Sequence, residues 1–228
     1  MKVCAIIMAA GSGKRMGGSV KKQFMKLNDR EIIKITTGVF ENCPQIDEIV
    51  AVTGKDEVEY VRELLGEFKK ISAVVVGGSE RQYSVYNGLK AAQGCDIVLI
   101  HDGVRPFVTE KDIVRCIEKT KEVDACVLGV PAKDTIKLCD SDGVINSTPD
   151  RKLLWYAQTP QCFKYKLIME AYKKSEEEQY LGTDDASLLE RMGAKVEMVM
   201  GSYDNIKITT PEDIVMGKAI LDKKSEKT

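Results

Sequence analysis

The order of apolar and amphipathic segments is the feature that most constrains the fold of this 228-residue chain. Apolar runs typical of buried parallel strands are found at 3–8, 46–53, 72–76, 96–101, 125–130 and 195–200. Between them, residues 56–68 and 110–122 carry apolar side chains at helical spacing. Thr109 directly precedes the second of these segments and can cap the start of a helix. This alternation predicts an α/β fold, with right-handed crossovers and a mostly parallel sheet covered by helices on both faces.

Residues 131–155 interrupt the alternation. Segments 131–138 and 144–154 are predicted to form two strands, joined by the turn signal Asp140-Ser141-Asp142-Gly143. An isolated hairpin is marginally stable, so we expect this β-arm to pack on something else: its own domain or a second subunit. No linker or repeat divides the chain. We therefore predict one domain over 1–222, including the arm, and a disordered tail at 223–228.

A glycine loop follows the first expected strand. It contains Ala9, Ala10, Gly11 and Gly13, and four cations follow: Lys14, Arg15, Lys21 and Lys22. The amides of such a loop form an anion-binding concavity, so the pattern is typical of polyphosphate binding. The loop does not fit the dinucleotide fingerprint, because the third glycine is Gly17, nor the Walker pattern, because Met8 and Arg15 occupy required positions. The alternative is a plain glycine turn before a solvated basic segment.

The loop resembles the signature of the sugar-phosphate nucleotidyltransferases, a strand followed by G-x-G-x-R-M and a lysine. Later segments narrow the resemblance to the 2-C-methyl-D-erythritol 4-phosphate cytidylyltransferases of the non-mevalonate isoprenoid pathway. These segments stand in family order between about residues 3 and 221: 77–85, 101–107, 131–135, 159–161, 183–187 and 204–209. The resemblance implies a Rossmann-like nucleotidyltransferase sheet with a protruding β-arm that a homodimer exchanges. It also implies a cytidylyl transfer from CTP to a polyol phosphate, with release of pyrophosphate and with Mg²⁺ on the triphosphate.

The resemblance also assigns catalytic roles to three cations. Arg15 and Lys22 would stabilise the charge that gathers on the α-phosphorus in the transition state, and Lys207 would contact a further phosphate. Lys14 and Lys21 are the expected solvated members of the cluster. For Lys207 the alternative is a solvated lysine on an edge strand.

Nucleotide contacts are expected from two glycine segments and one carboxylate. The predicted residues are Ala9, Ala10, Gly11, Gly13, Gly77, Gly78, Ser84 and Asp102. Asp102 would bind ribose hydroxyls or Mg²⁺ with its waters, although no metal ligand is assigned. For the segment around Gly77 and Gly78, the alternative is simply the start of a helix capped by Ser79. For Asp102, the alternative is an ion pair with Arg105 that stabilises a turn.

The acceptor pocket is expected to use Arg105 for the substrate phosphate. By resemblance it also includes Thr135, Arg151, Thr159 and Thr183, with Arg151 reaching the other subunit's site. Each threonine could instead have a purely structural role. Thr135 would be a β-branched strand residue, Thr159 the residue that precedes a proline, and Thr183 the N-cap of a helix.

Composition supports small-molecule substrates. With 34 basic and 35 acidic residues, the chain is not expected to bind nucleic acid or a membrane surface. Seven cysteines without a C-x-x-C pair, and no signal segment, predict a reducing, cytoplasmic setting. One histidine leaves little scope for zinc or triad chemistry, and we expect His101 to be structural. The alternatives are a ribitol- or other polyol-phosphate cytidylyltransferase and a non-catalytic nucleotide-binding protein.

Overall fold

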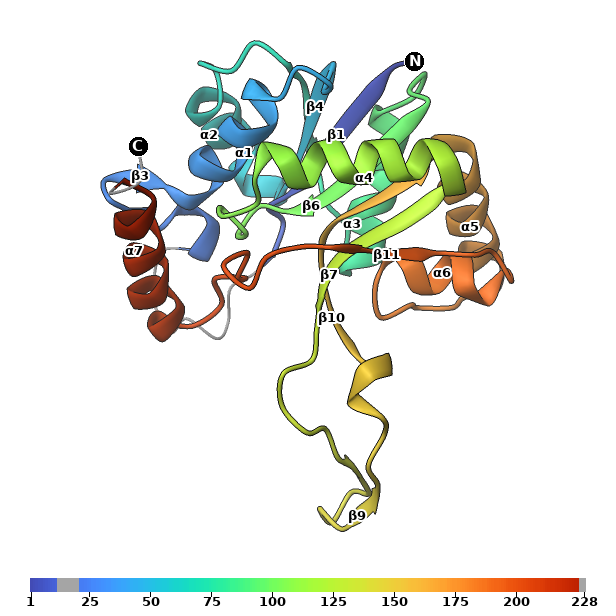
Figure 1. Ribbon diagram of the computed structural model, residues 1–228. Helices are drawn as coiled ribbons and strands as arrows, with labels where there is room; N and C mark the ends of the chain where they lie inside the picture. Colours follow the sequence, from blue (N-terminus) through green and yellow to red (C-terminus); the bar gives the residue numbers. More distant parts are fainter. Residues whose placement is uncertain (12–20, 226–228) are drawn as a thin grey trace.

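The computed structural model describes residues 1–11 and 21–225 (Figure 1). Its main sheet consists of β1 (Val3–Met8), β4 (Glu48–Thr53), β5 (Ile71–Val76), β6 (Ile97–Asp102), β7 (Ala125–Pro131), β10 (Trp155–Lys164) and β11 (Glu197–Met200). The strands lie in the order β11-β7-β10-β6-β1-β4-β5. All six apolar runs that were expected to be strands belong to this sheet.

Most neighbouring strands are parallel. β1 pairs in parallel with both β4 and β6, β4 with β5, and β11 with β7. β1 and β6 are buried along almost their whole length, as expected for central strands covered on both faces. The prediction of a mostly parallel α/β sheet is confirmed.

β10 is the strand of the main sheet that the apolar pattern did not predict. It runs antiparallel between β6 and β7. Its sequence is interrupted by polar residues and by Pro160, and a proline argues against a central strand. The structure accommodates Pro160 in a bulge between Ala157 and Gln161, where the missing N–H disrupts the pairing least.

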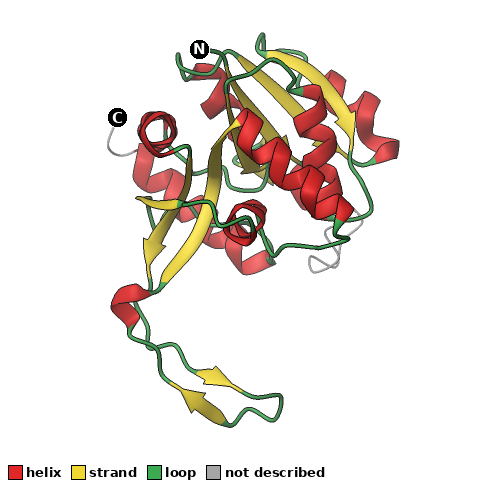
Figure 2. Cartoon of the chain, turned by 90° about the vertical axis from the view of Figure 1, so that its right-hand side faces the viewer, coloured by secondary structure: helices red, strands yellow, loops and turns green. Residues whose placement is uncertain are grey.

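Helices cover both faces of the sheet (Figures 1 and 2). They are α1 (Ile32–Asn42), α2 (Val58–Leu64), α3 (Arg81–Ala91), α4 (Glu110–Val123), α5 (Tyr165–Glu177), α6 (Asp185–Arg191) and α7 (Pro211–Ser225). One hydrophobic cluster joins α1, α2 and α4 to one face, and a second joins α3, α5 and α6 to the other. Within the described part of the chain, none of the helices has both the length and the apolarity needed to cross a membrane.

A third hydrophobic cluster holds the C-terminal helix. Leu27 and Phe107 belong to it, and Ile214 and Ile220 of α7 pack against it. α7 continues to Ser225, so the helix extends three residues into the segment 223–228 that was expected to be a disordered tail. The remaining short elements are β2 (Lys26–Leu27), β3 (Arg30–Glu31), η2 (Lys22–Phe24), η3 (Lys55–Glu57) and η4 (Arg151–Leu153).

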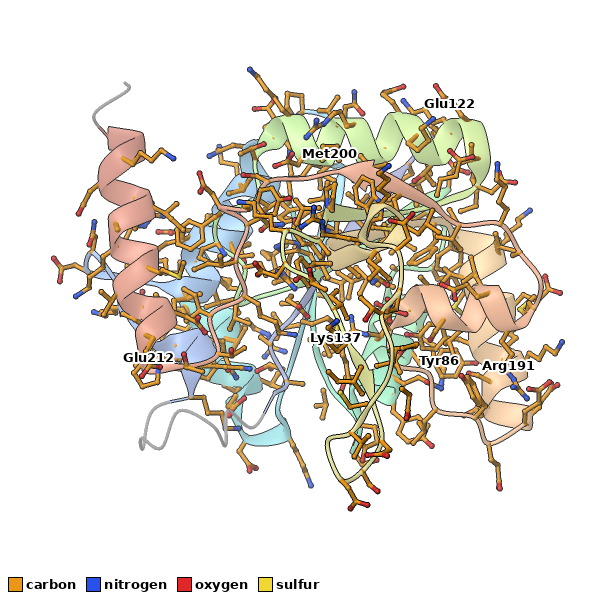
Figure 3. All side chains as sticks on the ribbon, turned by 60° about the horizontal axis from the view of Figure 1, so that its bottom comes forward. Tyr86, Glu122, Lys137, Arg191, Met200 and Glu212 are labelled. Carbon is orange, nitrogen blue, oxygen red and sulfur yellow. The ribbon has the colours of Figure 1, made fainter. Side chains whose placement is uncertain are left out.

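The β-arm projects from the sheet beyond β7 and β10 (Figures 1 and 2). Its strands are only β8 (Leu138–Cys139) and β9 (Ile145–Ser147), joined by a turn in which the Asp140 carboxylate accepts from two backbone N–H groups. Lys137, labelled in Figure 3, donates to Thr148 across the arm at 2.8 Å. The turn is confirmed, but the expected strands 131–138 and 144–154 are mostly irregular, because a hairpin without a core has little to order it.

Candidate functional site

A cavity of about 320 Å³ opens at the carboxyl ends of β1 and β6. Its wall contains the last residues of these strands, Met8 and Asp102, together with the start of α3 and Lys207 from the segment before α7. Ligands of open parallel sheets bind at this edge. The cavity brings together eight predicted site residues: Ala9, Ala10, Gly11, Lys22, Gly78, Ser84, Asp102 and Lys207.

A buried glutamine holds the first loop in place. Gln23 donates from Nε2 to the carbonyl of Ala9 at 2.6 Å and to that of Gly11 at 3.3 Å. The loop is also tied to the sheet, because the Ala9 N–H donates to Val52. The motif analysis did not single out Gln23. Its position directly after Lys22 was the available signal.

The second glycine segment packs directly against the first loop. A Cβ on Gly77 would lie 2.6 Å from the Ala10 side chain, and one on Gly78 would lie 2.4 Å from Tyr83, so neither position tolerates a larger residue without movement. Ser84 accepts from the Gly78 N–H at 3.0 Å and donates to the Glu80 carbonyl at 2.9 Å. Ser84 therefore shapes this loop as well as lining the cavity.

The two alternatives that made Ser79 and Thr183 helix caps are wrong. The N-cap of α3 is Glu80, not Ser79, and its side chain makes no capping bond. The N-cap of α6 is Asp184, not Thr183, and its carboxylate accepts from the Ser187 N–H at 2.9 Å. In both cases the helix starts one residue later than expected, and in α6 a carboxylate that accepts from the first turn fixes the start.

Three cations surround the Asp102 carboxylate. Lys207 Nζ lies 2.9 Å from Oδ2, Arg105 Nε lies 3.3 Å from it, and Arg81 Nε lies 3.9 Å from Oδ1. Burial alone would raise the pKa of Asp102, but the charges of Lys207, Arg81 and Arg105 hold this pKa well below its usual range. Asp102 is therefore ionised and concentrates positive charge at the cavity. Lys207 lies outside any strand, which excludes the edge-strand alternative.

Arg81 is a cavity residue that the motif analysis missed. Its guanidinium makes a two-pronged contact with the buried Asp185 carboxylate, at 2.9 and 2.7 Å, and Tyr172 also donates to Asp185 at 2.6 Å. Burial lowers the pKa of Arg81, but the charge and hydrogen bonds of Asp185, together with the charge of Asp102, outweigh burial and raise this pKa, so the cation is permanent. The local signal for this role was an arginine directly after Gly77-Gly78-Ser79-Glu80.

A chain of hydrogen bonds runs behind Asp102. Thr159 Oγ1 accepts from the Asp102 N–H at 3.1 Å and lies 3.0 Å from His101 Nδ1, while His101 Nε2 lies 3.1 Å from the Arg105 carbonyl. Because a carbonyl only accepts, Nε2 carries the proton and Nδ1 accepts from Thr159. Arg105 also donates to the Asn205 carbonyl at 3.0 Å. The Asp102–Arg105 pair is thus present, and Thr159 contacts residues of the site from behind.

His101 is expected to make the stability of the protein fall in mild acid. Its ring is fully buried, which lowers its pKa to about 4. The unfolded chain therefore binds the proton first, so stability is complete above about pH 6.5 and is lost as the pH falls toward 4. Between pH 7.5 and pH 5 the free energy of unfolding should fall by about 2 kcal/mol through this group. Urea unfolding of wild type and His101→Gln at both pH values checks this, and an equal loss in the variant would contradict it.

Other predicted residues lie outside the cavity. Thr135 and Arg151 are exposed on the arm, where Arg151 donates to the Lys133 carbonyl at 2.7 Å. Thr135 is not in a strand, contrary to its ordinary alternative, and Thr183 is exposed beside α6. Gly77 packs behind Ala10, and Arg105 and Thr159 lie behind Asp102.

The first basic cluster is only partly described. Gly13, Lys14 and Arg15 lie outside the described residues. Lys22 is half-buried in the cavity wall, whereas Lys21 forms an ion pair with Glu57. Among the described wall residues, carboxylates come from Asp102 and Glu80. Magnesium prefers such oxygen ligands, and an ionised Asp102 fits that requirement.

Comparisons with known proteins agree along the whole chain. A family model for 2-C-methyl-D-erythritol 4-phosphate cytidylyltransferase matches residues 3–223. The chain belongs to this family. The cytidylyltransferase of Geobacter metallireducens is 48% identical over 231 residues, covering 98% of this chain and 99% of its own. That of Clostridioides difficile is 51% identical over 220 residues, covering 95% and 92%. A crystal structure of 4-diphosphocytidyl-2C-methyl-D-erythritol synthase from Anaerococcus prevotii has a TM-score of 0.87 and 36% identity, covering 97% of this chain and 96% of that chain.

Membership of the cytidylyltransferase family establishes the reaction. The enzyme transfers the cytidylyl group of CTP to 2-C-methyl-D-erythritol 4-phosphate in isoprenoid biosynthesis. The fold is the Rossmann-like nucleotidyltransferase fold of its structural neighbours, as the resemblance implied. The ribitol-phosphate and non-catalytic alternatives are therefore set aside.

Proposed function

We propose that the cavity between the two glycine segments binds CTP, and that cations at its edge stabilise the transition state of transfer. The observation that carries this assignment is the cluster in which Lys207, Arg81 and Arg105 surround the ionised Asp102. Lys22 lies in the same wall, and Arg15 precedes it by seven positions in the sequence. Charges that are already positioned need little reorganisation when negative charge develops on the α-phosphorus.

In the proposed mechanism, a phosphate oxygen of methylerythritol phosphate attacks the α-phosphorus of CTP. A new P–O bond forms, the bond to the bridging oxygen of the β-phosphate breaks, and pyrophosphate leaves. A phosphate monoester has its second pKa near 6, so it is largely ionised at neutral pH and needs no general base. His101 fits this picture, because its ring is buried and hydrogen-bonded behind the site.

Magnesium is proposed to accompany the nucleotide. Asp102 would hold it, directly or through its waters, and the ion would neutralise charge on the triphosphate. Lys207 and Arg81 keep Asp102 ionised for this purpose. Ala9, Ala10, Gly11, Gly13, Gly77 and Gly78 are proposed to approach the nucleotide through their backbone, which requires small residues.

We further propose that the acceptor site is completed by a second subunit. Leu138, Val144, Ile145 and Leu153 of the arm are each more than half exposed, which favours a partner surface for them. Arg151 and Thr135 would then serve the neighbour's site. Arg105, Thr159 and Thr183 would act in their own subunit, with Arg105 directed at the substrate phosphate.

A cytoplasmic setting is also proposed. All seven cysteines are free thiols and six of them are buried, which favours a reducing compartment.

The assigned base site predicts a strong preference for CTP over UTP. Uracil reverses the donor and the acceptor at position 4, so a buried backbone group facing it would be left unpaired at a cost of about 1–3 kcal/mol. That cost lowers kcat/KM by about 5- to 150-fold. Pyrophosphate release with CTP, UTP and ATP, each with methylerythritol and ribitol phosphates, checks both the base and the acceptor. Equal turnover of CTP and UTP would contradict the backbone assignment.

A further inference from the structure

A second group of ligand-type side chains lies at the other end of the sheet. Cys4, Glu48 and Cys95 bring two sulfur atoms and a carboxylate oxygen within 4.8 Å of one another. Cys95 Sγ is 2.8 Å from Glu48 Oε1. Cys4 precedes Met8 of the cavity wall by four residues of β1, a span of roughly 13 Å. The cytidylyl transfer uses none of these three side chains.

Rigid elements hold the three residues. Cys4 lies on β1 directly opposite Glu48 on β4 in the parallel pairing. Cys95 precedes β6, and the next residue, Asp96, is tied to Lys2 in both directions: the Lys2 N–H donates to the Asp96 carboxylate at 2.7 Å and the Asp96 N–H donates to the Lys2 carbonyl at 2.8 Å. A site built on strand ends in this way needs little ordering when a ligand binds.

The surroundings of the cluster balance the charge of a bound divalent ion. We propose that Cys4, Glu48 and Cys95 bind one Zn²⁺ through two thiolates and Glu48 Oε1, with water in the fourth position. Two thiolates and a carboxylate around Zn²⁺ leave one negative charge, and Lys2 Nζ already lies 2.9 Å from the other Glu48 oxygen, Oε2. Lys2 thus neutralises the site and orients the carboxylate. Binding releases the two thiol protons to solvent.

This cluster differs from a second cluster of ligand-type side chains in its exposure to solvent. Cys116, Cys126 and Cys162 are also within 4.8 Å of one another, but all three are fully buried. The Glu48 side chain is 16% exposed, whereas Cys4 and Cys95 are buried at 0% and 6%, so the first cluster meets solvent on its Glu48 side. The three-thiol cluster serves as an internal comparison.

The test uses reduced wild-type enzyme without nucleotide, titrated with Co²⁺ as a spectroscopic probe and then with Zn²⁺. We expect one Co²⁺ per chain, with sulfur-to-cobalt charge-transfer absorption that Zn²⁺ displaces. Cys4→Ser and Cys95→Ser should each lower Zn²⁺ affinity by more than about a hundredfold, beyond the loss typical of an outer-sphere partner. Glu48→Gln should weaken binding while keeping the sulfur absorption. The matched controls, Cys139→Ser at an exposed thiol and Cys126→Ser in the three-thiol cluster, should bind as wild type does.

Folding and metal binding are measured separately. CTP turnover and circular dichroism show whether each variant is folded, since the cluster is remote from the cavity. Wild type should also melt at a higher temperature with Zn²⁺, and Cys95→Ser should not. Absence of charge-transfer absorption in wild type, its persistence in both Cys4→Ser and Cys95→Ser, or its loss in Cys126→Ser would each overturn the proposal.

Discussion

Replacing Lys22 with alanine is expected to lower kcat about a hundredfold and to weaken CTP binding far less. Its charge should matter most as negative charge gathers on the α-phosphorus, and one well-placed electrostatic contact is worth roughly 3 kcal/mol in the transition state. Arg15→Ala should behave in the same way, because the planar Arg15 guanidinium is proposed to meet the same charge. Steady-state turnover, together with CTP binding by calorimetry, separates the two effects.

Lys21→Ala is the matched control for these variants. Lys21 is adjacent to Lys22 in the chain, but its ammonium pairs with Glu57. Removing it changes the net charge equally and should leave kcat within about threefold of wild type, because a surface ion pair contributes little. Near-wild-type turnover of Lys22→Ala at saturating substrates would remove Lys22 from the mechanism.

Mixing two inactive variants is expected to restore about a quarter of wild-type activity if the arm serves the neighbouring subunit. Lys22→Ala carries its defect in the cavity wall, and Arg151→Ala carries its defect on the arm. Random pairing after joint refolding makes about half of the dimers mixed, and each mixed dimer has one site with both defects and one with neither. Turnover is measured before and after refolding, at equal subunit concentrations.

The control for the mixing experiment pairs Lys22→Ala with Lys207→Ala. Both residues line one cavity of the same chain, so every site in that mixture keeps a defect and no activity returns. No recovery from the Lys22→Ala and Arg151→Ala mixture, in dimers shown to be mixed by mass, would mean that Arg151 does not act in the neighbour's site.

The parallel strands and the first glycine loop were predictable from the sequence because their signals are local. A buried strand such as Val3–Met8 must be apolar along its whole length, and a backbone that approaches Ala10 as closely as Gly77 does excludes a Cβ. The order of the motifs was enough to indicate the family and the reaction. The glycine positions and the apolar strand are visible in the residues themselves, and the sequence by itself determined them together with the order of the motifs.

The polar cluster behind the cavity depended on tertiary structure. Arg81 and Asp185 are 104 positions apart, and the sequence around either residue does not indicate that they form an ion pair. Asp102 similarly meets Lys207 only because β6 and the segment before α7 end at the same edge of the sheet. β10 was missed for a related reason: Gln158, Thr159 and Gln161 make a polar segment that becomes buried only when distant partners satisfy its side chains. The sequence by itself determined the parallel strands and the kind of chemistry that the motifs carry. Only the tertiary structure decided which charges meet, because burial and pairing of polar groups are set by contacts between residues far apart in the chain.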